Sequence, residues 1–99
     1  MSAIRAGRER DYRSISEQLH YFRDIEGREV DFVITESRRP RLIVECKWSD
    51  AAPDRSLRYL KARFPDADAW QISAAGTKDY RSPDGIRVAP AVELLRTLV

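Results

Sequence analysis

Two stretches near the middle of the chain alternate apolar and polar residues with a period of two. These stretches are REVDFVITE at 28–36 and RLIVECKWS at 41–49, and such alternation is typical of β-strands with one buried face. A similar stretch, LHYFRDI at 19–25, precedes them. The connections are short, with a glycine at position 27 and a polar turn over 37–40. Three strands joined in this way are predicted to form an antiparallel meander.

The apolar spacing then changes to a helical period. A helix is predicted with Asp54 as its N-cap or Pro53 in its first turn, and Pro65 is predicted to end it. The apolar stripe of this helix is predicted to contain Leu57, Leu60, Lys61 and Phe64. The next stretch, ADAWQISAA at 67–75, is predicted to be a fourth strand, parallel to its neighbour because a helix separates it from the third.

The C-terminal part is predicted to contain a loop over 76–85, an extended segment over 86–90 and a helix over 91–99. The apolar side of that helix is predicted to consist of Val92, Leu95, Leu98 and Val99. We expect residues 1–18 to be a polar, truncated N-terminal segment, whose thin helical stripe consists of Ile4, Tyr12, Ile15 and Leu19. The order (α)βββαβ(β)α predicts an α/β domain over 19–99, with a mixed central sheet flanked by helices.

The alternation also sorts the charged residues of the second and third strands onto one face. The two apolar faces are predicted to contain Val30, Phe32 and Ile34 on one strand and Leu42, Val44, Cys46 and Trp48 on the other. If these faces lie together, the opposite side gathers Glu29, Asp31, Glu45 and Lys47. Two carboxylates about 5 Å apart repel by roughly 3 kcal/mol at an effective dielectric constant of 20. One lysine cannot offset three acids, so solvent, a bound proton or a divalent cation must balance the group.

Two interpretations of this charged face stay open. Carboxylate oxygens and a backbone carbonyl suit Mg²⁺ or Mn²⁺, and a lysine beside such an ion can hold or deprotonate a water and stabilise a phosphate. This chemistry hydrolyses phosphodiesters. The alternative is a sheet face turned to water, with cross-strand Glu–Lys pairs that add a few tenths of a kcal/mol.

Composition limits the cellular compartments in which the protein is expected. No apolar run approaches the ~20 residues of a membrane span, and the N-terminal residues lack the apolar core of a secretory signal. A single cysteine excludes a disulfide within the chain, so we expect a protein of the reducing cytoplasm. The predicted core also contains Cys46, Trp48 and Trp70.

Net charge says less about partners than the distribution of charge does. The chain has 18 basic and 16 acidic residues, for a net charge of +2. If three of the acids form one site, the rest of the charge count is eighteen basic against thirteen acidic residues, a balance of +5. An acidic pocket on a basic body suits a polyanion held around a metal ion, although an ordinary mixed surface has the same composition.

The spacing of these residues resembles a known signature. Asp31 followed by Glu45-Cys46-Lys47 within an apolar strand resembles the D…(D/E)-x-K motif of the PD-(D/E)XK nuclease superfamily, and the αβββαβ order is similar to its restriction-endonuclease-like core. The runs LHYFRDIEGREVDFV and LIVECKWS look most like a C-terminal domain of unknown function on predicted bacterial and archaeal AAA+ ATPases. They are more distantly similar to archaeal Holliday-junction resolvases. The resemblance covers residues 19–99.

The resemblance implies a role for each matching residue. Asp31 and Glu45 would be metal ligands, with the backbone carbonyl of Cys46 as a further ligand, and Lys47 would orient or activate the attacking water. Glu29, Gln71 and Glu17 would be added ligands or would support the site. Independently of the resemblance, Arg38 and Arg39 at the turn and Lys61 on the predicted helix are candidate contacts to nucleic acid. A solvated turn is the alternative for the two arginines.

The sequence is therefore compatible with two functions from different classes. The first is Mg²⁺- or Mn²⁺-dependent hydrolysis of DNA, with a homodimer expected because a small domain makes few phosphate contacts. The second is a non-catalytic interaction, oligomerisation or nucleic-acid-binding module that retains the nuclease fold. The chain has no G-x-x-x-x-G-K-[ST] motif, so we expect no ATP binding of that kind. Relative to the ATPases it resembles, the chain is then a detached domain, a standalone paralogue or a remnant.

Overall fold

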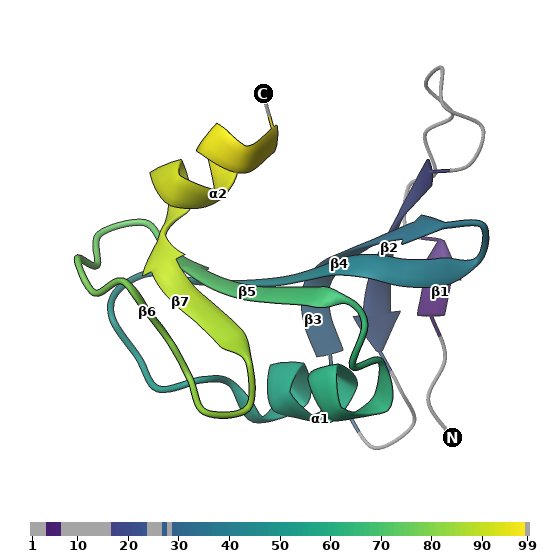
Figure 1. Ribbon diagram of the computed structural model, residues 1–99, viewed down its shortest axis with the longest axis horizontal. Coiled ribbons are helices and arrows are strands. Elements are labelled where there is room, and N and C mark those ends of the chain that lie inside the picture. The colour runs from purple at the N-terminus through teal and green to yellow at the C-terminus, as the bar shows by residue number, and fades with distance from the viewer. Residues whose placement is uncertain (1–3, 7–16, 24–26, 28, 99) are drawn as a thin grey trace.

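The protein forms one mixed β-sheet with a helix on each face, in a computed structural model that describes residues 4–6, 17–23, 27 and 29–98 (Figure 1). The strands are β1 (Ile4–Ala6), β2 (Glu17–Arg23), β3 (Glu29–Glu36), β4 (Arg39–Lys47), β5 (Asp68–Ser73), β6 (Tyr80–Arg81) and β7 (Ile86–Pro90). The helices are α1 (Arg55–Arg63) and α2 (Ala91–Leu98). The sheet order is β1-β2-β3-β4-β5-β7-β6.

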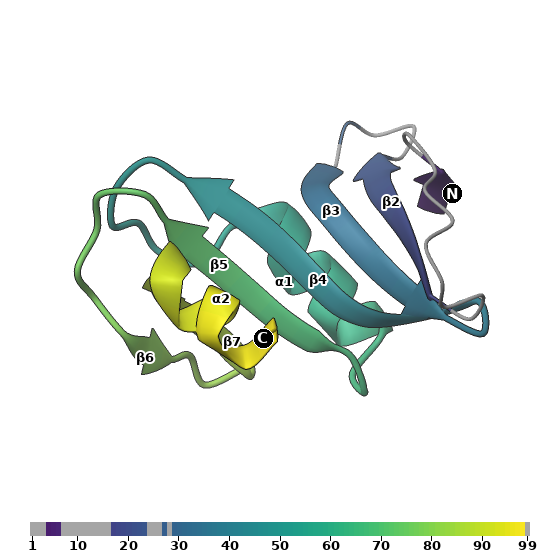
Figure 2. The same cartoon turned by 90° about the horizontal axis from the view of Figure 1, so that it is seen from above.

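The antiparallel meander is confirmed, and so is the parallel fourth strand. β2, β3 and β4 pair antiparallel, while β4 pairs parallel with β5, and β5 parallel with β7. The α1 crossover joins the parallel pair β4–β5 and lies on the opposite face of the sheet from α2 (Figure 2). The α/β class with a mixed sheet between helices is therefore confirmed.

Helix α1 begins and ends as the sequence predicts. The Asp54 carboxylate accepts hydrogen bonds from the amides of Ser56 and Leu57, at 2.9 and 3.4 Å, which satisfies two donors of the first turn. Phe64 is the C-cap, directly before Pro65. Leu57 and Leu60 are fully buried against the sheet, so the predicted apolar stripe is confirmed at these two positions.

Two apolar clusters fill the two sides of the sheet. The cluster beneath α1 contains Val30, Val33, Ile43, Leu57, Leu60, Ala67, Ala69, Ile86 and Val88. The cluster beneath α2 contains Leu42, Val44, Trp70, Ala89 and Leu94. Val30 packs on the α1 side, not beside Phe32 as predicted, and it is paired with Phe22 at the point where the β2–β3 register shifts.

Several sequence predictions about the α2 side are wrong. Helix α2 has eight residues and lies over β5 and β7 (Figure 2), which leaves the C-terminal end of β4 uncovered. Trp48 is consequently 78% exposed, and Cys46 is exposed rather than buried. Leu94 is the buried residue of α2, whereas the predicted apolar side is about half exposed at Val92, Leu95 and Leu98. Trp70 is buried as predicted, at 8% exposure.

Two further elements differ from the prediction. Ile4–Ala6 is an edge strand paired with β2, not the start of a helix, and the rest of the predicted helical stripe before Leu19 lies outside the described residues. The predicted loop over 76–85 contains the short strand β6, which pairs with β7 through the turn that ends at Gly85. None of the helices in the described ranges is long and apolar enough to cross a lipid bilayer.

Candidate active site at the end of strand β4

The candidate site forms where β3 and β4 separate. Their ladder ends at the pair Phe32–Val44, so Asp31 and Glu45 are the next residue on each strand. Beyond this point the Asp31 carboxylate takes the place of a backbone acceptor and receives the amide hydrogen of Cys46, at 2.7 Å. Asp31 and Glu45 are therefore close enough for the charge of Asp31 to act on Glu45.

Glu45 is the most perturbed acid of this site. Its side chain is 14% exposed, and its Oε1 is buried without a hydrogen-bond partner. Burial, followed by the negative charges of Asp31 and Asp54, raises the pKa of Glu45 to about 7, against the partial compensation of Lys47. At neutral pH this carboxyl group is therefore protonated in about half of the molecules, because the positive charge of Lys47 is too small to stabilise the buried carboxylate.

Lys47 lies between two carboxylates. Its Nζ atom is 2.9 Å from Asp54 Oδ1 and 3.6 Å from Glu45 Oε2. The hydrogen bond to Asp54 is the main reason that the pKa of Lys47 is raised, despite an opposing effect of burial. Lys47 is therefore an ammonium ion at neutral pH, and it can donate hydrogen bonds but cannot act as a base.

Asp54 belongs to the site, although the sequence pattern predicts it only as a helix cap. Its Oδ2 accepts from the first turn of α1 while its Oδ1 binds Lys47. The Lys47 ammonium and the capped amides together hold the pKa of Asp54 below its ordinary value, against the effect of burial. A clue was present in the sequence, because the helix of a parallel crossover begins near the C-terminal end of the preceding strand, where Lys47 lies.

Gln71 supports the site from the neighbouring strand. It pairs with Glu45 across the β4–β5 ladder and is 2% exposed. Its Oε1 accepts from the Asp54 amide at 2.8 Å, and its Nε2 donates to the carbonyls of Ala51 and Ala52, each at 3.0 Å. Gln71 therefore fixes the loop that carries Asp54, and it does not point a free polar group into the site.

A second set of hydrogen bonds, made by Asp50, connects the two loops beside the site. The Asp50 carboxylate accepts from the amides of Thr77 and Lys78 at 3.0 to 3.2 Å, which joins the β4–α1 loop to the β5–β6 loop. Gly76 allows this approach, because a Cβ atom at that position would collide with Asp50 and with the Ser73 hydroxyl. Backbone bonds from Ala74 to Lys47 and from Ala75 to Trp48 continue the contact.

Other predicted site residues lie elsewhere. Backbone register places Glu17 opposite Glu36, at the far end of β3 from Asp31, so the structure does not bring these two acids together. Glu29 lies two residues before Asp31, and its side chain is outside the described residues. Lys61 lies in the last turn of α1, where its ammonium donates to the carbonyls of Pro65 and Ala67 at 2.8 and 2.7 Å. Lys61 therefore does not face the candidate site.

The donor set fits a cation that keeps part of its water shell. Within the described residues, no three acidic, histidine or cysteine side chains gather closely enough to form a metal cage. Mg²⁺ commonly needs only one or two carboxylates, with waters and substrate oxygens in its remaining positions. Asp31, Glu45 and the Cys46 carbonyl are such a set, and the unpartnered Glu45 Oε1 is an oxygen that a cation would satisfy.

Cys46 itself offers no nucleophile here. Partial burial of its sulfur and the nearby Asp31 and Glu45 carboxylates raise the pKa of its thiol, which therefore stays protonated at neutral pH. The inert character predicted for Cys46 agrees with this shift, although its predicted burial is wrong.

Comparison with known proteins places the chain in a family. A family model described as "Domain of unknown function (DUF4143)" matches residues 4–94. No curated protein and no solved structure gives a significant match to the chain. Since the family match covers nearly the whole sequence, the chain belongs to the DUF4143 family of domains of unknown function.

Proposed function

We propose that this domain is a divalent-cation-dependent phosphodiesterase that acts on DNA and has a restriction-endonuclease-like core. One observation carries the proposal, namely the buried and unpartnered Glu45 Oε1 beside two further carboxylates. Structural carboxylates are normally paired or exposed, because an uncompensated buried charge costs several kcal/mol. A divalent cation would remove that cost.

The proposed roles follow from the surroundings of each side chain. Asp31, Glu45 and the Cys46 carbonyl would hold Mg²⁺ or Mn²⁺, which supplies a polarised phosphate and an activated water when it is bound. Lys47, as an ammonium ion, would donate to a phosphate oxygen or to the attacking water. Asp54 orients Lys47 through their 2.9 Å contact, and Gln71 holds Asp54 in place.

The likeness of the D…E-x-K spacing to the PD-(D/E)XK signature supports the same proposal. The parallel β4–β5 pair and the α1 crossover agree with the element order of that superfamily. The expected DNA substrate and the expected homodimer belong to this proposal, and the cleavage assay below tests the substrate.

A non-catalytic module is the second candidate, and one observation favours it. No side-chain cluster of three metal ligands exists among the described residues, and Lys47 is already engaged by Asp54 and Glu45. In that case the charged face would be a closed ion-pair network with no need for a cation.

Thermal stability in the presence of cations separates the two candidates. The wild type should gain about 2.7 kcal/mol in unfolding free energy when Mg²⁺ or Mn²⁺ reaches one hundred times its dissociation constant. Asp31→Asn and Glu45→Gln should lose that gain. Asp68→Asn removes an exposed carboxylate at the opposite end of β5, and this control should respond as the wild type does.

The cleavage assay then tests the chemistry. Supercoiled and branched DNA are offered with Mn²⁺, and Lys47→Ala should lower the cleavage rate at least a hundredfold, in the range of a lost acid–base or charge-stabilising group. Cleavage that persists unchanged in Lys47→Ala would identify a contaminant. If the wild type neither gains stability from either cation nor cleaves DNA, the phosphodiesterase proposal is wrong and the non-catalytic module is the remaining candidate.

A further inference from the structure

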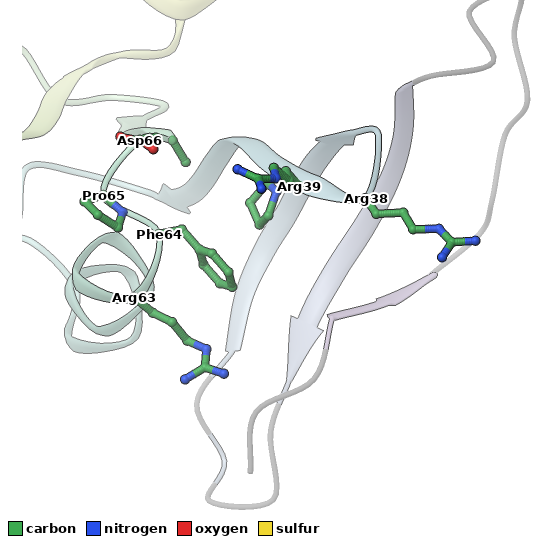
Figure 3. Close-up of a pocket in the computed structure, with 8 residues that line it drawn as sticks. Arg38, Arg39, Arg63, Phe64, Pro65 and Asp66 are labelled. Carbon is green, nitrogen blue, oxygen red and sulfur yellow. The ribbon is translucent and has the colours of Figure 1, made fainter.

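A second cavity lies at the other end of β4, away from the carboxylates. This Phe64 pocket has a volume of about 310 Å³ and lies between the β3–β4 turn and the C-terminal end of α1 (Figure 3). Its charged and aromatic lining consists of Arg38, Arg39, Arg63, Phe64 and Asp66. The size is at the lower end of the range for small-molecule sites, and it suits a single nucleotide better than a larger ligand.

The arginines of the pocket are available, unlike several others in the protein. Arg58, Arg87 and Arg96 each pair with a carboxylate, at 2.7 to 3.3 Å. Within the described part of the chain, no ion pair joins a carboxylate to Arg39 or Arg63, and both are exposed. Arginine binds phosphate oxygens through its planar fork of donors. Two guanidinium groups beside one cavity, with no carboxylate partner among the described residues, therefore favour a phosphate ligand.

Phe64 supplies an aromatic surface between these two arginines. Part of the Phe64 side chain packs against the core cluster beneath α1, and the remainder lines the pocket. Figure 3 shows the ring between the side chains of Arg39 and Arg63, while Arg38 points away from it. The Arg63 guanidinium carbon is 5.8 Å from the ring centroid. Stacking of a base on such a ring is worth about 1–3 kcal/mol by alanine substitution and tolerates any base.

The exposed side of α1 carries more basic than acidic residues. The sequence of α1, RSLRYLKAR, contains no acidic residue, and Arg55 and Arg63 are exposed along it, as is Arg58, which pairs with Asp84. The N-terminal end of α1 carries Asp54 at the candidate active site, and its C-terminal end carries Phe64. Nine helical residues span about 14 Å, which is about four phosphates of a stacked strand at 3.4 Å each.

We propose that the Phe64 pocket binds one nucleotide of a single-stranded nucleic acid, with its base stacked on Phe64 and its flanking phosphates on Arg39 and Arg63. The strand follows α1, so the bound nucleotide lies about four positions from the phosphate at the candidate active site. The inference rests on the proposed function in one respect, because it takes nucleic acid as the ligand.

Binding is measured without metal, so that the carboxylate site takes no part. Fluorescence anisotropy follows a labelled twelve-nucleotide oligodeoxythymidine in EDTA, over a series of salt concentrations. Arg39→Gln and Arg63→Gln should each raise Kd by three- to tenfold and reduce the slope of log K against log salt by about 0.7, the value for one phosphate contact on a single strand. Arg96→Gln is the matched control on α2, and it should change neither quantity.

The aromatic contact has its own signature. Phe64→Leu should raise Kd by about tenfold and leave the salt slope unchanged, because it removes stacking without removing charge. Phe64→Tyr keeps the ring and should restore binding, which separates stacking from a loss of fold. Circular dichroism of both variants checks that α1 is retained.

The outcomes separate this inference from the proposed function. Wild-type protein that fails to bind the oligonucleotide, or variants of Arg39, Arg63 and Phe64 that bind as Arg96→Gln does, would overturn the inference. Binding in EDTA by a protein that cleaves nothing with Mn²⁺ would support this inference and contradict the proposed function. Mn²⁺-dependent cleavage that none of the three pocket variants affects would contradict only the inference.

Discussion

Glu45 and Lys47 lie on the same strand, but the protein disfavours the charged form of Glu45 and favours the charged form of Lys47. The two side chains are 3.6 Å apart, yet only Lys47 keeps its charge firmly at neutral pH. Lys47 has a second acidic partner in Asp54, whereas Glu45 has two acidic neighbours and an oxygen that no donor reaches. The ion pair between them is therefore too weak to offset the burial of Glu45.

The pH dependence of stability should report this cost. The pKa of Glu45 is about 7 in the folded protein and 4.5 as its ordinary value, so the folded state binds more protons between these two values. Stability therefore falls as pH rises from 5 to 8. Glu45→Gln should remove that fall and stabilise the protein by about 1 to 2 kcal/mol at pH 8, with no gain at pH 5, after allowance for partial exposure.

Urea denaturation at pH 5 and pH 8 measures the difference between the wild type and the variant. Asp68→Asn, at an exposed carboxylate, serves as the control. Parallel stability curves for the wild type and Glu45→Gln across this range would contradict the assigned environment of Glu45.

The β3–β4 hairpin is the element in which local geometry and residue type disagree most clearly. Its two turn residues, Ser37 and Arg38, have φ angles of 54° and 68°. Two positive φ values in a two-residue turn match the type I′ conformation, which normally selects Asn-Gly. A side chain in this region costs about 1 kcal/mol or more, so the hairpin retains Arg38 against its conformational preference.

Replacement of the strained residue should therefore stabilise the protein. Arg38→Gly should raise the unfolding free energy by up to about 1 kcal/mol, because glycine adopts positive φ without a steric penalty. The same change at Arg39, which lies within β4 and has no positive φ, should instead cost roughly 0.5 to 1 kcal/mol. Chemical denaturation of the two variants measures both effects, and a loss of stability in Arg38→Gly would show that the turn does not relax as expected.

At the scale of the whole molecule, the candidate site depends on the crossover that joins β4 to β5. Glu45, Asp54 and Gln71 come from a strand, a loop and a second strand. The parallel pairing of β4 with β5 sets Gln71 beside Glu45, and the loop is then fastened by the three hydrogen bonds of Gln71. The arrangement of the acids is thus a property of the folded domain and not of the β3–β4 hairpin alone.

Loss of the three Gln71 hydrogen bonds should lower the stability of the fold and also free the loop that carries Asp54. Gln71→Leu keeps approximate volume but leaves the Asp54 amide and two loop carbonyls without their partner, at a cost of about 2 kcal/mol. Urea denaturation measures the loss, and hydrogen exchange should show faster exchange of the amides of Ala51, Ala52 and Asp54. Protection of those amides equal to the wild type would show that other contacts hold the loop.

Much of the fold was predictable because its strands and helices follow simple periods. The strands around Asp31 and Glu45, the cap at Asp54 and the parallel crossover all agree with the structure. Predictions failed where burial depends on how far a neighbouring element extends. Trp48 and Cys46 alternate as core residues do, but α2 is too short to cover them, and alternation in a sequence does not state the length of a distant helix.

The candidate site was predictable in part for a related reason. Strand periodicity predicts Asp31, Glu45 and Lys47 on one side, and the structure brings Glu45 close to both of the other residues. Asp54 was missed as a partner of Lys47 because a helix cap already explains an aspartate at that position. The proximity of Asp54 to Lys47 arises from tertiary packing, which a local pattern does not contain.

Strand β6 has a consequence for how this domain can meet other proteins. It has only two residues, and Arg81 within it donates to the carbonyl of Gly85 at 3.1 Å. A long, apolar edge strand would offer a template for pairing with strands of other chains, which leads to aggregation or to the capture of extended peptides. At this border, Tyr80 and Arg81 cover the middle of β7 and present almost no ladder of their own. Partners that approach from this side must therefore be recognised through side chains and not by addition of a strand.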